Sequence, residues 1–116
     1  KEGCYHGGGI SPGLSMRFQA LHTFTARLPL VSPKDGAPLT GDTTEKSILS
    51  GVINGSLAEL DGIIVQYEKK FEGLRVILCG GDSAFFENKL KASIFASPEL
   101  VLIGLNSILN HNVNQS

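Results

Sequence analysis

The chain has no tryptophan, a single methionine, two cysteines and no excess of charge of either sign. Its formal net charge is −1, from 10 Lys and Arg against 11 Asp and Glu in 116 residues. Without a basic field, charge alone does not recruit nucleic acid or anionic lipid. We find no uninterrupted apolar run of the roughly 18 residues that a membrane span needs, and no signal-peptide pattern. We therefore expect neither nucleic acid nor a membrane as a partner.

The two cysteines, Cys4 and Cys79, both lie in strand-like segments. Neither has a CxxC partner or a histidine at metal-ligand spacing, so a metal site is not indicated. The sequence leaves a disulfide open but favours two buried thiols in a reduced, cytosolic protein.

The composition indicates one globular domain with a single core. Hydrophobic residues make up 41% of the chain and charged residues 18%, which argues against disorder. The expected order is strand, helix, long loop, long helix, strand, helix, strand, helix, which predicts an α/β fold with parallel crossovers. By residue number, these elements are a strand within 1–10, a helix from 11 to about 27, a loop over 29–41, a helix from 42, a strand over 74–79, a helix to about 90, a turn over 96–98, a strand over 99–103 and a helix over 105–109.

Local signals set the expected helix starts. Ser11 followed by proline predicts one N-cap, and Asp42 with Glu45 three residues later predicts another. Within the long helix, Gly51 and Gly55 suggest a close approach by another backbone, with a plain small-residue surface as the alternative.

Two glycine runs stand where an extended segment is expected to give way to a helix. They are Gly7 to Gly13, in the order Gly-Gly-Gly-Ile-Ser-Pro-Gly, and Gly80-Gly81. Bare backbone N–H groups at such a junction can face a phosphate or nucleotide, although a plain turn explains either run equally well. Neither run has the P-loop or dinucleotide-binding spacing. The three histidines share no spacing, and no complete active site is visible.

Five short motifs together resemble the type III pantothenate kinases in order and spacing. The resemblance covers nearly the whole chain and predicts that it is the C-terminal half of such an enzyme. The motifs are Gly7-Gly8-x-Ile10-x-Pro12-Gly13, Ala26-Arg27-Leu28-Pro29, Gly41-x-x-Thr44-x-x-x-Ile48-x-x-Gly51, Leu78-Cys79-Gly80-Gly81-Asp82-Ser83-Ala84 and Leu102-Ile103-Gly104-Leu105.

The resemblance implies a partial ribonuclease-H-like domain of the actin-like ATPase type, with a mixed sheet and flanking helices, over residues 1–116. It also implies transfer of the γ-phosphoryl group of ATP to pantothenate, the first step of coenzyme A synthesis. Such enzymes are cytoplasmic homodimers that use Mg²⁺ and a monovalent cation, K⁺ or NH₄⁺.

Carried onto this sequence, the resemblance assigns Ile10, Thr25 and Thr44 to the pantothenate pocket. Thr44 is also a candidate ligand of the monovalent cation. Gly80 and Gly81 are assigned to the adenosine side of the ATP site. Phe24 stands where some relatives have histidine, and Cys79 where many have threonine.

Segments that carry the family's phosphate loop and catalytic Asp are not among these 116 residues, and we expect that Asp upstream of Lys1. Because phosphoryl transfer relies on metal and phosphate-binding loops, we expect the chain alone to be inactive. Its uncovered strand edge and helix faces also predict poor solubility in isolation. Two alternatives stay open: a non-catalytic accessory or regulatory protein of the same superfamily, and an unrelated nucleotide-binding α/β module.

Overall fold

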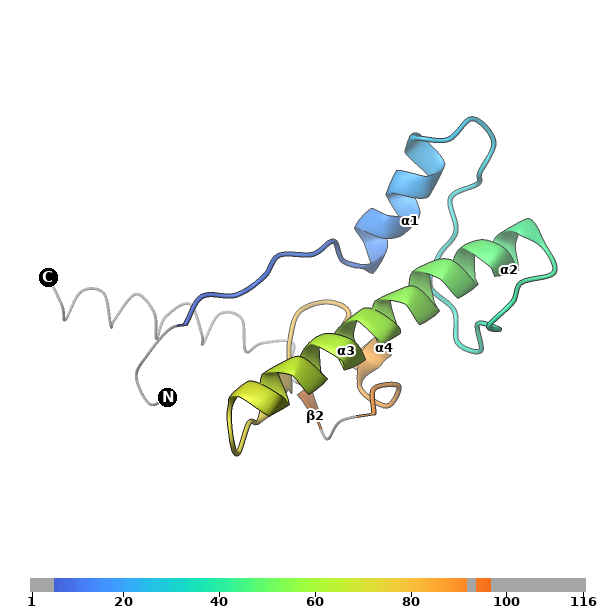
Figure 1. The fold of residues 1–116 in the computed structure, drawn as a ribbon. Helices are drawn as coiled ribbons and strands as arrows, with labels where there is room; N and C mark the ends of the chain where they lie inside the picture. Colours follow the sequence, from blue (N-terminus) through green and yellow to red (C-terminus); the bar gives the residue numbers. More distant parts are fainter. Residues whose placement is uncertain (1–5, 92–93, 97–116) are drawn as a thin grey trace, which may run out of the picture.

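The computed structural model describes residues 6–91 and 94–96 (Figure 1). The elements in chain order are α1 (Leu14–Thr23), α2 (Thr44–Leu49), the π-helical segment η1 (Ser50–Asn54), α3 (Gly55–Lys70), β1 (Val76–Leu78), α4 (Ser83–Phe86) and β2 (Ile94–Ala96).

A single helical rod, formed by α2, η1 and α3 end to end, is the longest feature of the chain (Figure 1). It begins where the Thr43 side chain accepts a hydrogen bond of 3.1 Å from the Lys46 backbone N–H, which satisfies one of the free donors of the first turn. It ends at Phe71, whose backbone is extended. The expected long helix is therefore confirmed, but its N-cap is Thr43 and not Asp42.

The rod is long and apolar enough to cross a membrane by length and composition alone. It spans Thr44–Lys70, 27 residues, with a mean hydropathy of 1.5 over its most apolar 18-residue window. That test allows up to two charged residues in the window, and Glu59 and Asp61 interrupt the segment, so the expectation of no uninterrupted apolar run of this length is unaffected. The core helix of a soluble protein passes the same test, and one face of this rod is indeed buried against α1 and α4.

The core lies where α1 crosses the N-terminal part of the rod. Leu14 and Phe18 of α1 are four residues apart, on one helix face, and are 1% and 2% exposed. They pack with buried residues of the rod, of the loop after α1 and of α4: Val31, Ile48, Leu49, Val52, Ile53 and Phe86. Beyond this contact Ile64 is still buried, at 9% exposed, whereas Ile63 and Tyr67 are 46% and 40% exposed.

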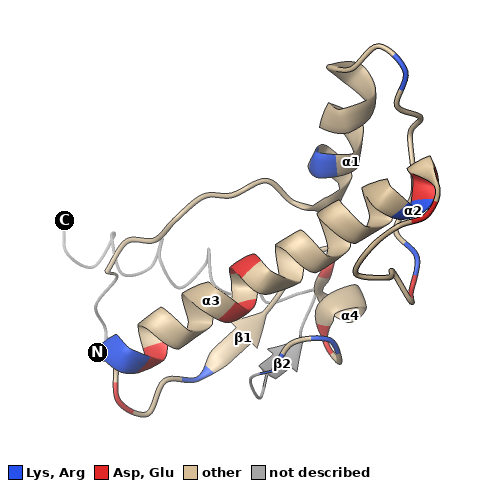
Figure 2. Cartoon of the chain, turned by 45° about the vertical axis from the view of Figure 1, so that its right-hand side comes forward, with Lys and Arg blue, Asp and Glu red and all other residues tan. Residues whose placement is uncertain are grey.

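The strands β1 and β2 pair in parallel, with Val76 opposite Ile94 and Leu78 opposite Ala96. The connection between them carries α4, as a parallel crossover requires (Figure 2). The predicted strand at 74–79 is confirmed over Val76–Leu78, whereas β2 was not expected, and Ala96 belongs to it and not to a turn. The described sheet is parallel and two-stranded, and the wider mixed sheet remains a prediction.

Several other expectations are corrected. Residues 6–10 are irregular and not part of a strand, and α1 begins after Gly13, because Ser11 is used elsewhere. A Cβ placed on Gly51 or Gly55 would meet nothing within 4 Å, so the plain-surface alternative holds for both. Cys79 is exposed and free, not buried. The expected strand at 99–103, the helix at 105–109, Cys4 and His111 lie outside the described residues.

Candidate functional site

A hollow of about 690 Å³ opens where the rod begins, and we refer to it as the helix-start hollow. One wall comes from the end of α1 and the loop after it, and the other from the first turns of the rod. It is lined by Leu21, Leu28, Gly41, Asp42, Thr43, Thr44, Ser47, Ile48 and Gly51.

Gly41, just before the rod, lets the preceding loop pack closely against the first helical turn. A Cβ on Gly41 would lie 2.3 Å from the Ser47 backbone nitrogen and 2.4 Å from the Lys46 carbonyl carbon. Only glycine permits this approach without movement of the backbone. The hydroxyl of Ser47 also donates to the Gly41 carbonyl at 3.3 Å, so the loop end and the helix start form one unit.

Two of the three predicted substrate residues lie at this hollow or beside it. Thr44 lines it, its side chain is exposed, and its hydroxyl makes no hydrogen bond with the part of the chain that the structure describes. Thr25 sits just beyond α1, where its hydroxyl donates to the Leu21 carbonyl and accepts from the Leu28 N–H at 3.4 Å. Leu21 and Leu28 line the hollow, so these two hydrogen bonds of Thr25 hold together the wall that faces the rod.

The third predicted substrate residue lies elsewhere. Ile10 is fully exposed and lines a second hollow of about 650 Å³ along α3, together with Ile63 and Tyr67. Within the described residues, the structure therefore does not bring Ile10 to the helix-start hollow.

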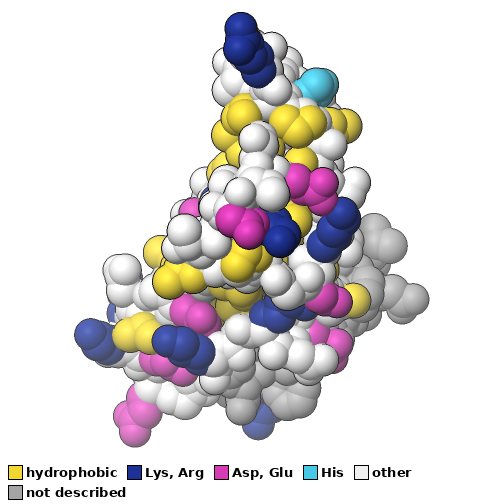
Figure 3. All heavy atoms as spheres, turned by 90° about the vertical axis from the view of Figure 1, so that its right-hand side faces the viewer, with side chains coloured by type: hydrophobic (Ala, Val, Ile, Leu, Met, Phe, Trp, Pro, Cys, Tyr) yellow, Lys and Arg dark blue, Asp and Glu magenta, His cyan; other side chains and the backbone are white. Residues whose placement is uncertain are grey.

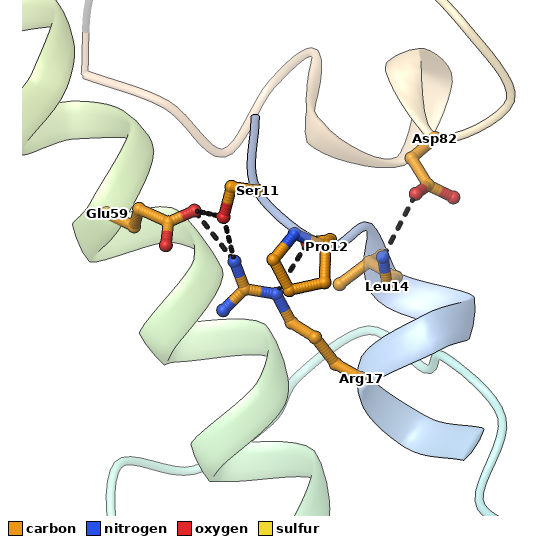
Figure 4. A network of polar contacts seen from close by, with 6 residues as sticks. All are labelled: Ser11, Pro12, Leu14, Arg17, Glu59 and Asp82. Atoms are coloured by element: carbon orange, nitrogen blue, oxygen red, sulfur yellow. Dashed lines mark hydrogen bonds and ion pairs between the residues drawn. The ribbon is translucent and has the colours of Figure 1, made fainter. Parts of the chain in front are cut away.

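The two glycine runs meet each other. The Leu14 N–H, at the start of α1, donates to a carboxylate oxygen of Asp82 at 3.3 Å, and a Cβ on Gly13 would lie 3.4 Å from the same oxygen (Figure 4). A carboxylate at a helix N-terminus is favourable because the helix dipole is positive there. Asp82 stands at the N-cap position of α4 but its side chain makes no capping bond there; its carboxylate binds the start of α1 and so ties the first run to Gly80-Gly81.

Gly80 and Gly81 form an open turn after β1. Gly80 has φ of +98°, a conformation that favours glycine, and neither residue would meet another atom within 4 Å through an added Cβ. The backbone there is accessible to a flat group, which is what an adenosine contact requires.

The side chain of Arg17, in α1, connects this helix to the rod. Its guanidinium donates to the Pro12 carbonyl at 2.8 Å, to the Ser11 hydroxyl at 2.9 Å and to a Glu59 carboxylate oxygen at 2.7 Å, so Arg17 holds three segments together (Figure 4). Ser11 also donates to Glu59 at 2.8 Å. Hydrogen bonds from Arg17 and Ser11 hold the pKa of Glu59 below its usual value.

Charged side chains elsewhere lie at the surface, and some of them form ion pairs. Lys34 and Glu45 form an ion pair at 2.6 Å, and hydrogen bonding and the charge of Lys34 lower the pKa of Glu45. Positive and negative side chains are interspersed on the face seen in Figure 3, and residues of both signs are spread over the chain in Figure 2. The expectation that nucleic acid is not a partner stays a prediction.

Side-chain ligands for a cation are few in the described part of the chain. No group of three or more His, Cys, Asp or Glu side chains lies close enough to hold a metal ion in the described part of the chain. Near Thr44, the Thr43 hydroxyl already accepts from Lys46, and Asp42 pairs with the Lys46 ammonium at 3.4 Å. Thr44 alone supplies one oxygen, which is too few for a coordination shell.

Sequence reasoning missed the contacts that link distant segments. Nothing in the sequence pairs Arg17 with Glu59 or Asp82 with the start of α1, because these contacts depend on how α1 crosses the rod. Gly41 was recognised as part of a motif, but its close contact with Ser47 was not.

Comparison with known proteins gives the family. A family profile for type III pantothenate kinase matches residues 1–66. A type III pantothenate kinase of Christiangramia forsetii is 57% identical over 111 residues, which cover 96% of this chain and 46% of the relative. Corresponding proteins of Cytophaga hutchinsonii and Porphyromonas gingivalis are 51% and 46% identical, over 94% and 97% of the chain.

The chain spans about half the length of the curated relatives it matches. The match extends over more than half of this chain in the family profile and over nearly all of it in the relatives, which rules out an unrelated nucleotide-binding module. The chain therefore belongs to the type III pantothenate kinases, a family of transferases of coenzyme A biosynthesis.

Proposed function

We propose that the protein to which this chain belongs phosphorylates pantothenate with ATP, and that this chain forms part of the wall that holds pantothenate. The proposal joins the family membership to the helix-start hollow. The observation that carries it is Thr44, an exposed hydroxyl at the start of a long helix, in a hollow that also has apolar side chains from α1, the loop and the rod.

The hollow suits the chemistry of pantothenate. Leu21, Leu28 and Ile48 offer apolar surface for the dimethyl group, and Thr44 offers a hydroxyl for a polar group of the substrate. The N-terminal end of a long helix also favours a carboxylate, because its first N–H groups and dipole are positive. The pocket thus combines apolar walls with a few polar groups, as small-molecule sites do.

ATP is the donor that kinase membership implies, and it supplies the phosphoryl group. In our proposal Gly80 and Gly81 lie against its adenosine part, since the surface above both is open. Asp82 holds this turn to the start of α1, so donor and acceptor walls are linked through one helix. Mg²⁺ and a monovalent cation are part of the proposed reaction, and the described residues offer neither a cluster of His, Cys, Asp or Glu ligands.

Homodimer formation in the cytoplasm is the remaining part of the proposal. Large apolar side chains stay exposed on α1 and on the distal part of the rod, and a partner surface would cover them. Examples with their exposed fractions are Met16 64%, Phe24 85%, Ile63 46% and Val65 45%. Ile10 keeps its proposed place near the pantothenate only if such an assembly brings it there.

A hybrid enzyme tests the proposed function. In it, this chain replaces the matching segment of the Christiangramia forsetii relative, so that the remainder of that protein is present. We expect phosphorylation that requires both ATP and pantothenate, and Thr44→Val to raise KM for pantothenate more than Thr44→Ser does. Binding of both ligands without turnover would support the accessory-protein alternative, and no binding of either would refute the proposal.

A further inference from the structure

Three polar side chains on one side of the rod bind three carbonyls of the loop that precedes it. Ser47 donates to the Gly41 carbonyl at 3.3 Å, Ser50 to the Leu39 carbonyl at 2.5 Å, and Asn54 to the Pro38 carbonyl at 3.0 Å. We call these three side chains the loop clamp. Their spacing of three and four residues places them on neighbouring turns of one helix face.

The clamp coincides with the irregular part of the rod. Ser50 is the first residue of the π-helical segment and Asn54 is the last, and the Asn54 amide also donates to the Ser50 hydroxyl at 3.4 Å. Segments of π-helix occur frequently at functional sites. Here the π-helical segment faces the loop that precedes the rod. Gly51, inside this segment, lines the helix-start hollow.

Hydrogen bonding holds this loop more than burial of its side chains does. The Leu39 side chain is 85% exposed, so it contributes little to the core. The bonds from Ser50 and Asn54 are part-buried, where water competes less. Release of the loop would therefore cost little core packing, but it would move the loop end.

The end of that loop is a rim of the hollow. Gly41, whose carbonyl Ser47 binds, and the next two residues, Asp42 and Thr43, line the hollow beside Thr44. A shift of the loop would open the contact between Gly41 and Ser47 and change the shape of the rim. The clamp thus acts on the hollow through the loop and need not touch a ligand.

We propose that Ser50 and Asn54, with Ser47, are positioning residues that fix loop 38–41 and thereby set the affinity for the acceptor substrate. The inference rests on the proposed function for the identity of the acceptor, pantothenate. The role of the clamp in holding the loop can be measured separately.

The test uses the hybrid enzyme with Ser50→Ala and Asn54→Ala. Each change removes one bond to the loop, so we expect KM for pantothenate to rise about five- to tenfold, with kcat within twofold and KM for ATP unchanged. Ser50→Thr keeps the hydroxyl and should restore KM. Ser56→Ala is the matched control, because Ser56 is also a buried serine of the rod but its hydroxyl has no hydrogen-bond partner among the described residues.

Hydrogen exchange provides the second readout. Amides of residues 39–44 should exchange faster in Asn54→Ala and not in Ser56→Ala. A fall in kcat with both KM values unchanged and no change in exchange would show a merely structural role and overturn the inference. If the hybrid has no pantothenate kinase activity, the proposed function fails, while faster exchange at 39–44 would still support the clamp and unchanged exchange would refute it.

Discussion

Substitution of Gly41 by alanine tests how tightly the loop closes on the rod. The added Cβ would lie 2.3 Å from the Ser47 nitrogen, whereas ordinary contacts begin near 3.4 Å. The atoms it meets belong to the backbone of the first helical turn, so no side-chain rotation relieves the overlap. The loop and the helix start must separate by about 1 Å.

The cost follows from what that separation breaks. Overpacking of this kind costs about 1–3 kcal/mol. A shift of 1 Å also removes the hydrogen bond from Ser47 to the Gly41 carbonyl, now 3.3 Å, at about 1 kcal/mol. We therefore expect Gly41→Ala to lower the free energy of unfolding by about 2–4 kcal/mol.

Thermal unfolding of the hybrid enzyme measures this cost. At about 2–4 °C per kcal/mol for a domain of 150–250 residues, the Tm should fall by about 5–15 °C. Gly55→Ala is the control: its Cβ meets nothing within 4 Å and it lies in the helix, so it should gain about 0.5–1 kcal/mol and raise the Tm slightly. Equal Tm values for Gly41→Ala and Gly55→Ala would refute the reasoning.

Three further changes probe the core and the contacts between distant segments, each through the Tm of the hybrid enzyme. Phe18→Ala empties a site that is 2% exposed and should cost about 3–5 kcal/mol, and a Tm within 2 °C of the parent would contradict a core at this crossing. Asp82→Asn removes the charge at the start of α1 and should cost about 0.3–1 kcal/mol, less in high salt, and a salt-independent loss would argue against a dipole effect. The pKa of Glu59 is lower in the folded chain than in the unfolded chain, so the ionised carboxylate stabilises the fold above the unfolded pKa, and this stabilisation is lost as pH falls through the folded pKa. The Tm of the parent should therefore drop more steeply between pH 5 and 3 than the Tm of Glu59→Gln. Parallel curves of Tm against pH for the two proteins would exclude this contribution.

The sequence predicted the elements whose signals are local. The rod follows from its hydrophobic spacing and from polar residues at its start, and the strand at Val76–Leu78 follows from an apolar run before two glycines. Family membership was predictable because five motifs stand in register along the chain, although each is weak alone.

The errors have physical causes. Ser11 looks like an N-cap, but its hydroxyl bonds to Glu59, 48 residues away, and α1 starts three residues later. Asp42 looks like a cap, but Thr43 has the geometry to reach the Lys46 N–H. Partners so distant in sequence depend on how α1 crosses the rod, which no local pattern encodes.

Within the candidate site, the structure places Thr44 at the helix-start hollow and Ile10 apart from it, and both assignments to the pantothenate pocket stay predictions. Thr44 lines the helix-start hollow, as its position at a helix start suggested. Ile10 precedes α1 in an irregular segment whose course the sequence does not define, and it lies along α3. The loop clamp went unnoticed because serine and asparagine in a helix carry no distinctive pattern.

Hydrogen exchange of the hybrid enzyme with each ligand in turn tests the central claim most directly. Pantothenate should slow exchange of the amides in residues 41–47, at the helix-start hollow, and ADP should slow those in residues 79–83, around Gly80 and Gly81. Protection by pantothenate at 79–83 but not at 41–47, or at neither segment, would contradict the assignment of this chain to the acceptor wall.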